Sequence, residues 1–149
     1  MPDDTQLTPI AEGLFTGPPE EPRLIGSRCS ACGVVTFPRQ RSCPRCASLE
    51  VEERLLARRG TLWSWTIQCF LPKSPPYVAV DPDGFEPYGV GYVELPGELR
   101  VEARLTEADP DRLEIGMPME LALVPAPGER DGAVVTFAFR PVDDGEAGR

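Results

Sequence analysis

Two pairs of cysteines constrain this chain more than any other feature. Both pairs have the spacing C-x2-C: Cys29 with Cys32, and Cys43 with Cys46, with ten residues between the pairs. Each pair can wrap its backbone around one ion, and four thiolates complete the tetrahedral shell that zinc takes in structural ribbons. We therefore expect a zinc ribbon. Iron of the rubredoxin kind is the second choice, and four free or disulfide-linked cysteines are the alternative without metal.

The expected metal is structural. A catalytic zinc keeps an open position beside three protein ligands, whereas four cysteines close the shell. The module is also too small to bury much apolar surface, so metal binding would supply folding free energy. Gly33 allows a tight turn after the first pair, and the spacer is long enough for a short hairpin with Val34 to Phe37 as one arm.

Histidine is absent from the 149 residues. This excludes Ser-His-Asp and Cys-His catalysis and every His-containing metal site. The fifth cysteine, Cys69, lies beside Phe70 in an apolar run, and we expect a buried, inert thiol. Asp81, Asp83 and Glu86 lie in a Pro-rich segment, where Asp-Pro-Asp-Gly is first of all a turn sequence.

Charge is distributed unevenly along the chain. The net charge is −9, but residues 21–59 hold eight arginines and four glutamates, a net of +4, so the remainder carries −13. The arginines either balance the thiolates of the metal site or form a surface for a ligand's phosphates or an acidic partner. The acidic remainder argues against nucleic-acid binding, which needs a basic face.

The chain has no membrane-spanning pattern. No run approaches the roughly 18 apolar residues that a span requires, and the first six residues are acidic where a secretory signal would be basic and then apolar. We expect a cytoplasmic protein that does not bind a membrane.

From Gly60 onward the sequence consists of short β-rich runs separated by turns. Apolar and polar residues alternate from Leu99 to Leu105, as in a strand with one buried face. The connections are too short for βαβ crossovers, so we expect an all-β, mainly antiparallel sheet that closes into a small barrel. Trp63 and Trp65 share one face if their strand is regular. We expect them to pack in the barrel core or at an interface. Five strands are expected, at residues 62–70, 88–95, 99–105, 117–124 and 133–139.

Four segments follow from this pattern. They are an N-terminal arm at residues 1–22, a zinc ribbon with connector at 23–59, a barrel at 60–141 and a disordered acidic tail at 142–149. In the arm, Ile10, Leu14 and Phe15 have the spacing of one helical turn that docks elsewhere, with a partner subunit as one candidate.

The order of these modules resembles one known family. The four-cysteine ribbon is followed by Gly60-Thr-Leu-Trp-Ser-Trp-Thr66, Pro87-Tyr-Gly-Val-Gly-Tyr-Val-Glu-Leu-Pro-Gly97, Leu113-Glu-Ile-Gly-Met117 and Val135-Thr-Phe-Ala-Phe-Arg-Pro141. Together they resemble the acyl-CoA-associated OB-fold family with an N-terminal rubredoxin-like zinc ribbon. The likeness covers roughly residues 10 to 141.

This resemblance implies a five-stranded OB-type barrel and a non-catalytic accessory subunit. Such a subunit binds a thiolase-superfamily enzyme in a hetero-oligomer and helps it handle a CoA thioester. A steroid side-chain aldolase is the first choice of partner, and an aromatic-acid thiolase the second. The metal ligands match at Cys29, Cys32, Cys43 and Cys46, and no catalytic residue is carried over.

Two alternatives come from other classes of protein. Ribbon plus OB architecture alone also fits a single-stranded nucleic-acid binder, by analogy of fold. The third hypothesis is a stand-alone CoA or acyl-CoA carrier, in which ribbon arginines hold the phosphates.

Overall fold

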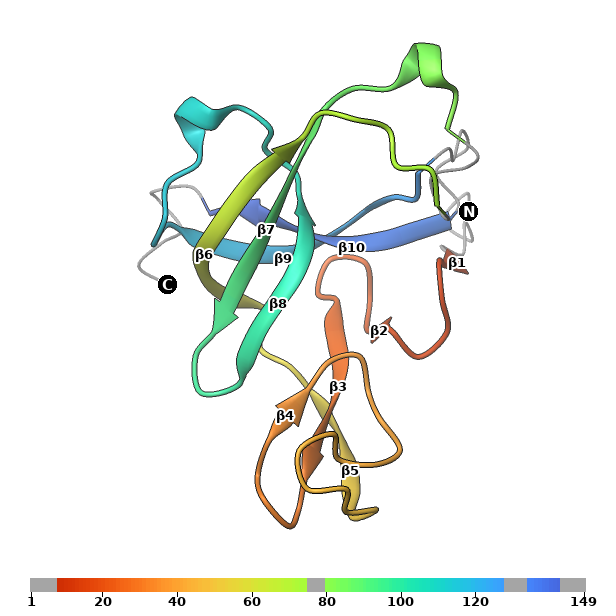
Figure 1. The fold of residues 1–149 in the computed structure, drawn as a ribbon, viewed down its shortest axis with the longest axis vertical. Coiled ribbons are helices and arrows are strands. Elements are labelled where there is room, and N and C mark those ends of the chain that lie inside the picture. Colours follow the sequence, from red (N-terminus) through yellow and green to blue (C-terminus); the bar gives the residue numbers. More distant parts are fainter. Residues whose placement is uncertain (1–7, 75–79, 128–133, 143–149) are drawn as a thin grey trace.

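The computed structural model describes residues 8–74, 80–127 and 134–142, whose regular structure is almost entirely β-strand (Figure 1). The helical elements within these ranges are two 3-10 turns, η3 (Pro82–Gly84) and η4 (Pro110–Arg112). Neither turn has the length or the apolar character needed to cross a membrane. A small ribbon sheet lies below a larger barrel in the view of Figure 1.

The ribbon sheet is organised around β3 (Arg23–Cys29), which leads into the first cysteine pair. β3 pairs antiparallel with three strands: β2 (Phe15–Thr16), β4 (Val35–Thr36) and β5 (Val51–Leu55). β4 lies inside the predicted hairpin arm, but its partner is β3 and not another part of the spacer. The two cysteine pairs therefore emerge from one small sheet.

The barrel contains five strands: β6 (Arg59–Gln68), β7 (Tyr88–Leu95), β8 (Leu99–Leu105), β9 (Pro118–Pro125) and β10 (Val134–Pro141). They pair in the closed order β6-β7-β8-β10-β9-β6, and all these pairings are antiparallel except β8 with β10. The structure confirms the predicted all-β, mainly antiparallel five-stranded barrel.

Strand β6 contains a bulge between Leu62 and Ser64. Leu62 pairs with Val93 and Ser64 with Tyr92, so Trp63 is the extra residue. An extra residue resets the alternation of faces, and Trp65 packs against the core while Trp63 is 46% exposed. The shared face was expected only for a regular strand, and the bulge removes that condition.

The predicted helical turn in the N-terminal arm is also wrong. Residues 10–14 turn irregularly between β1 (Thr8–Pro9) and β2, and Gly13 has a φ of +76°, which is incompatible with a right-handed helix. The arm packs on its own chain: β1 runs parallel to β10, and Phe15 is buried in the core.

The predicted acidic tail lies outside the described residues, apart from its first member. Val142 is buried, and its N–H donates to the carbonyl of Pro118 at 3.1 Å. Val142 therefore packs with the barrel.

One hydrophobic core joins the ribbon to the barrel. Phe15, Leu24 and Leu56 belong to the same cluster as the barrel residues, and Phe37 of the ribbon contacts Phe137 of β10 edge to face, with ring centroids 5.4 Å apart. The two parts are thus packed as one body. The barrel residues of the cluster are Leu62, Val93, Leu95, Val101, Ala103, Leu105, Leu113, Met119, Leu121, Val135 and Phe139.

Candidate functional site

The four predicted metal-ligating sulfurs lie together at the end of the ribbon. All are within 4.8 Å of one another, and Cys29–Cys46 and Cys32–Cys43 have Sγ–Sγ distances of 3.6 Å. Tetrahedral zinc at about 2.3 Å from each sulfur places its ligands about 3.8 Å apart. The donor set therefore fits a zinc ion, and none of these cysteines is in a disulfide.

Backbone N–H groups point at these sulfurs. The N–H of Cys32 donates to Cys29 Sγ, and those of Arg45 and Cys46 donate to Cys43 Sγ, each at 3.4 Å. The bond from Cys32 is the main reason that the pKa of Cys29 falls to about 6. Burial opposes the shift at Cys43, but the hydrogen bonds lower its pKa as well. Both sulfurs are thus biased toward the thiolate that binds metal.

Cys46 shows the opposite behaviour. A backbone hydrogen bond from Ser48 lowers its pKa, but the sulfur of Cys29, burial, and the sulfurs of Cys43 and Cys32 raise it to about 12. Four thiolates cannot all form this close together without a cation between them. Metal binding must therefore displace at least one proton.

Each cysteine pair ends in the same tight turn. The N–H of Gly33 donates to the carbonyl of Cys29, and that of Ala47 donates to the carbonyl of Cys43, both at 2.8 Å. Both residues have positive φ, +80° for Gly33 and +65° for Ala47. Ala47 is the one non-glycine residue with positive φ in the described ranges. Gly33 and Ala47 each directly follow the second cysteine of a pair. This equivalence could have predicted the positive φ of Ala47 from the sequence.

Most of the ribbon's arginine excess is neutralised inside the chain. Five of the eight arginines pair with glutamates, and Arg23 donates to the carbonyl of Leu56 at 2.7 Å. Within the described ranges Arg41 and Arg45 have no side-chain partner. This favours charge compensation over a broad anion-binding face on the ribbon. The pairs are Arg28–Glu52, Arg39–Glu53, Arg54–Glu98, Arg58–Glu120 and Arg59–Glu120.

Glu120 connects the end of the ribbon to the barrel. This buried carboxylate lies 3.7 Å from Arg58 and 2.9 Å from Arg59, and it also pairs with Arg140. Burial alone would raise its pKa, but the bond from Arg59 and the charges of Arg140 and Arg58 lower it below its ordinary value. The sequence offers no signal for this cluster, because Arg58 and Arg59, Glu120, and Arg140 lie far apart along the chain.

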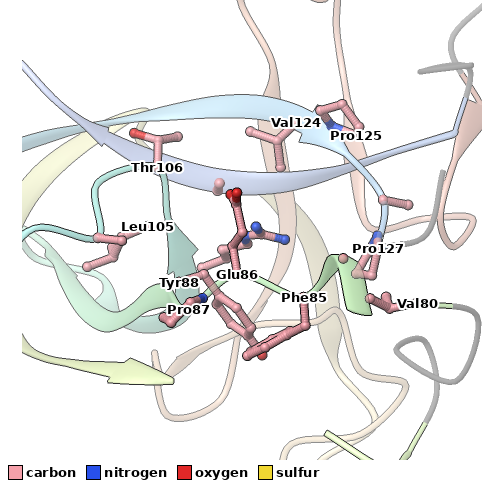
Figure 2. Close-up of a pocket in the computed structure, with 15 residues that line it drawn as sticks. Val80, Phe85, Glu86, Pro87, Tyr88, Leu105, Thr106, Val124, Pro125 and Pro127 are labelled. Atoms are coloured by element: carbon pink, nitrogen blue, oxygen red, sulfur yellow. The ribbon is translucent and has the colours of Figure 1, made fainter. Parts of the chain in front are cut away.

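A cavity of about 540 Å³ opens at one end of the barrel (Figure 2). The segment before β7, including Phe85 and Glu86, forms one side, and the end of β9 around Val124 forms another. Arg104 stacks on the ring of Tyr88, 4.6 Å from its centroid, and makes no ion pair with any described residue. The volume suits a small ligand or part of a larger one.

The other predicted candidates do not assemble into a catalytic set. Cys69 is exposed, so its predicted burial is wrong; β6 ends at Gln68, and strand alternation no longer determines burial beyond it. Asp81 caps η3 by accepting from the N–H of Asp83 at 3.0 Å, which confirms the predicted turn. Within the described ranges no base lies beside Cys69; its sulfur contacts the carbonyl of Ile67.

Two family models match this chain. Residues 17–52 match the rubredoxin-like zinc ribbon domain of ChsH2, and residues 53–124 match the C-terminal OB-fold domain of ChsH2. A solved structure described as the Ltp2-ChsH2(DUF35) aldolase superposes with a TM-score of 0.57 and 32% sequence identity, covering 80% of this chain and 84% of that chain.

Two curated relatives match over about four-fifths of their length. The benzoylsuccinyl-CoA thiolase subunit BbsA of Thauera aromatica is 33% identical, with 81% of this chain and 78% of the relative covered. A DUF35 domain-containing scaffold protein of Methanocaldococcus jannaschii is 30% identical, with 81% and 83% covered. On these matches the chain belongs to the DUF35 family and carries its ChsH2-type zinc ribbon and OB-fold domains.

Proposed function

We propose that this chain is a non-catalytic accessory subunit of a thiolase-superfamily enzyme that acts on an acyl-CoA. The observation that carries the proposal is the likeness, at 32% identity over 80% of the chain, to a protein solved as the Ltp2-ChsH2(DUF35) aldolase. The likeness to BbsA, named as a thiolase subunit, points in the same direction. In both names the relative is part of a larger enzyme.

The chemistry available in the chain supports this division of labour. Carbon–carbon cleavage or thiolysis needs a base, an oxyanion stabiliser and often an activated thiol. The chain has no histidine, and Cys69 is exposed, with the carbonyl of Ile67 as its contact among the described residues. Its own residues would therefore bind, orient and support the partner, and the reacting groups would come from the partner.

Co-expression with each thiolase-superfamily protein encoded in the same genome tests the proposal. We expect one complex on size exclusion, with the partner inactive or strongly impaired when purified alone. Two proteins that elute separately, with a partner fully active by itself, would contradict it.

A steroid side-chain aldolase is the partner we propose first, and an aromatic-acid thiolase second. The CoA thioester would be held where the two subunits meet. Incubating the purified complex with a β-hydroxy steroid acyl-CoA and, separately, with a β-ketoacyl-CoA plus free CoA distinguishes the two. Retro-aldol products from the first substrate are expected; thiolysis of the second alone would select the thiolase.

We further propose that Cys29, Cys32, Cys43 and Cys46 hold one structural zinc within a ribbon module of residues 23–59, ahead of a barrel at 60–141. Bound zinc would cross-link the two cysteine turns. Metal analysis of the purified chain should give one zinc per chain. Cys32→Ser should lose the metal and unfold the ribbon, and full zinc content in that variant would refute the ligand assignment.

A further inference from the structure

An aromatic cluster lies exposed on the outer face of β6, β7 and β8. Trp63 and Tyr92 meet edge to face with centroids 6.1 Å apart, and the guanidinium of Arg100 lies 4.0 Å from the Trp63 ring centroid. Trp63 is 46% exposed and Tyr92 39% exposed. We call these three residues the Trp63 cluster.

The bulge in β6 creates this cluster. Trp63 is the extra residue between the Leu62–Val93 and Ser64–Tyr92 pairs, so Trp65 can pack against the core while Trp63 stays on the surface. Bulges that re-aim a side chain are frequent beside functional sites. In a regular strand both tryptophans would lie on the same face of the sheet. One could then not pack in the core while the other stayed on the surface.

Neighbouring side chains hold the cluster in place. Arg100 Nε donates to Glu94 at 2.9 Å, and the Tyr92 hydroxyl lies 3.4 Å from the carboxylate of Glu102. All of these residues except Trp63 lie on the paired strands β7 and β8. Because the geometry exists before binding, little side-chain entropy remains to be lost when a partner docks.

The composition and surroundings are those of a protein-binding hot spot. Trp, Tyr and Arg are the residue types that dominate such hot spots, and each buries a large area on contact. A recess of about 350 Å³ adjoins the cluster on the β7–β8 hairpin and can receive a side chain of the partner. It is lined by Glu94, Leu95, Gly97, Glu98, Leu99 and Arg100.

Charge selects the kind of partner. The face alternates Glu94, Arg100 and Glu102 on a chain of net charge −9, which disfavours a nucleic acid. A second copy bound through a two-fold axis could set Glu94 of one chain against Arg100 of the other, so self-association is an outcome that the test must separate. A different protein is the occupant we commit to, because the similar solved structure is named for two components, Ltp2 and ChsH2.

We propose that the Trp63 cluster is the hot spot through which this chain binds the catalytic thiolase-superfamily subunit, an inference that rests on the proposed function. The affinity of this chain for the thiolase-superfamily protein that co-purifies with it is the first measurement. Trp63→Ala should weaken binding by about 30-fold or more, since hot-spot truncations cost about 2 kcal/mol and 1.4 kcal/mol is tenfold.

The matched control is Leu49→Ala. Leu49 is 80% exposed and lies in the ribbon, between Cys46 and β5, so its truncation should change affinity by less than about twofold. Both variants must keep their zinc and their melting temperature. Equal weakening by the two substitutions would overturn the proposal, because exposed apolar area in general would then explain the loss.

A second measurement covers the case in which Trp63→Ala does not fold. Trp65→Phe leaves Trp63 as the single tryptophan, because the chain has two. Adding the enzyme subunit should shift its fluorescence to the blue and reduce quenching by acrylamide. The proposal is overturned if acrylamide quenches Trp63 equally well in a formed complex. It is also overturned if an oligo-dT probe, or a higher concentration of the chain alone, protects Trp63 from quenching.

The first measurement also separates this inference from the proposed function. If the wild-type chain and the enzyme subunit form no complex, the proposed function fails and the docking surface with it. If the complex forms and Trp63→Ala binds within about threefold of wild type, only the docking surface fails.

Discussion

Ala47 occupies a backbone position that glycine occupies in the equivalent turn. Its φ of +65° is in the left-handed region, which costs a residue with a Cβ about 1–2 kcal/mol. Part of the gain from glycine is offset by the larger entropy of its unfolded state. Ala47→Gly should therefore raise the free energy of unfolding of the zinc-bound chain by up to about 1 kcal/mol, measured by denaturant titration.

The reciprocal change is the control. Gly33→Ala should destabilise the first turn by a similar or larger amount, because Gly33 has a φ of +80°. If Ala47→Gly destabilises the chain instead, the turn is not the source of strain at this position.

Glu120 gives a second prediction at the residue scale. Glu120→Gln should cost about 1–3 kcal/mol at pH 7, because three arginines lose a buried charged acceptor. The native pKa of Glu120 is lowered, so its stabilisation is present above the unfolded pKa near 4.3 and is lost as pH falls through the native value. The gap between wild type and variant should narrow below about pH 4 in urea titrations; a constant gap would show that packing, and not charge, is lost.

Whether the role of a residue could be predicted depends on how far apart along the sequence its partners lie. The four cysteines could be predicted because both pairs are local in sequence and their spacing already defines the ligand geometry. Glu120 could not, because Arg59 is 61 residues away and Arg140 is 20 residues away. The predicted burial of Cys69 is wrong because strand β6 ends one residue before it.

At the scale of elements, β7 and β8 could be predicted to the residue, because apolar and polar positions alternate along β8 and Pro96-Gly97 marks the turn between the two strands. Two ribbon strands could not. β3 is buried along nearly its whole length and shows no alternation, while β5, Val51–Leu55, is mostly charged. Both are strands because they pair with each other. The residue types in the two segments do not indicate this pairing.

Strand β6 carries a prediction of its own. A Cβ on Gly60 would overlap the carbonyl oxygen of Glu94 on the neighbouring strand. Gly60→Ala must therefore push two paired strands apart, and we expect a loss of at least about 1–3 kcal/mol in thermal or urea unfolding. Gly84→Ala is the control, because a Cβ there meets nothing within 4 Å; equal losses would contradict the steric explanation.

At the scale of the whole molecule, the shared core makes the ribbon and the barrel interdependent. Leu24 and Leu56 of the ribbon side are fully buried against barrel residues, and Glu98 of the β7–β8 hairpin accepts from Arg54 and from the N–H of Ala57. A ribbon that loses its metal therefore uncovers part of the barrel core.

Removing the metal from the wild-type chain tests this coupling. A strong chelator should lower the melting temperature of the barrel as well as that of the ribbon, since both share one core. Near-ultraviolet circular dichroism, which reports the packed Trp65 ring, follows the barrel, and a zinc-sensitive dye follows the metal. A barrel transition that stays unchanged after complete metal loss would show that the two parts unfold independently.

The pairing of the earliest described strand with the last has a consequence for synthesis on the ribosome. Thr8 pairs with Val134, and the barrel closes only when β10 meets β8 and β9. The fourth cysteine, Cys46, emerges roughly 90 residues earlier, which is about 4–18 seconds at ordinary elongation rates. During that interval the ribbon's apolar side chains have no barrel to cover them, so the nascent chain needs its metal before it has a core.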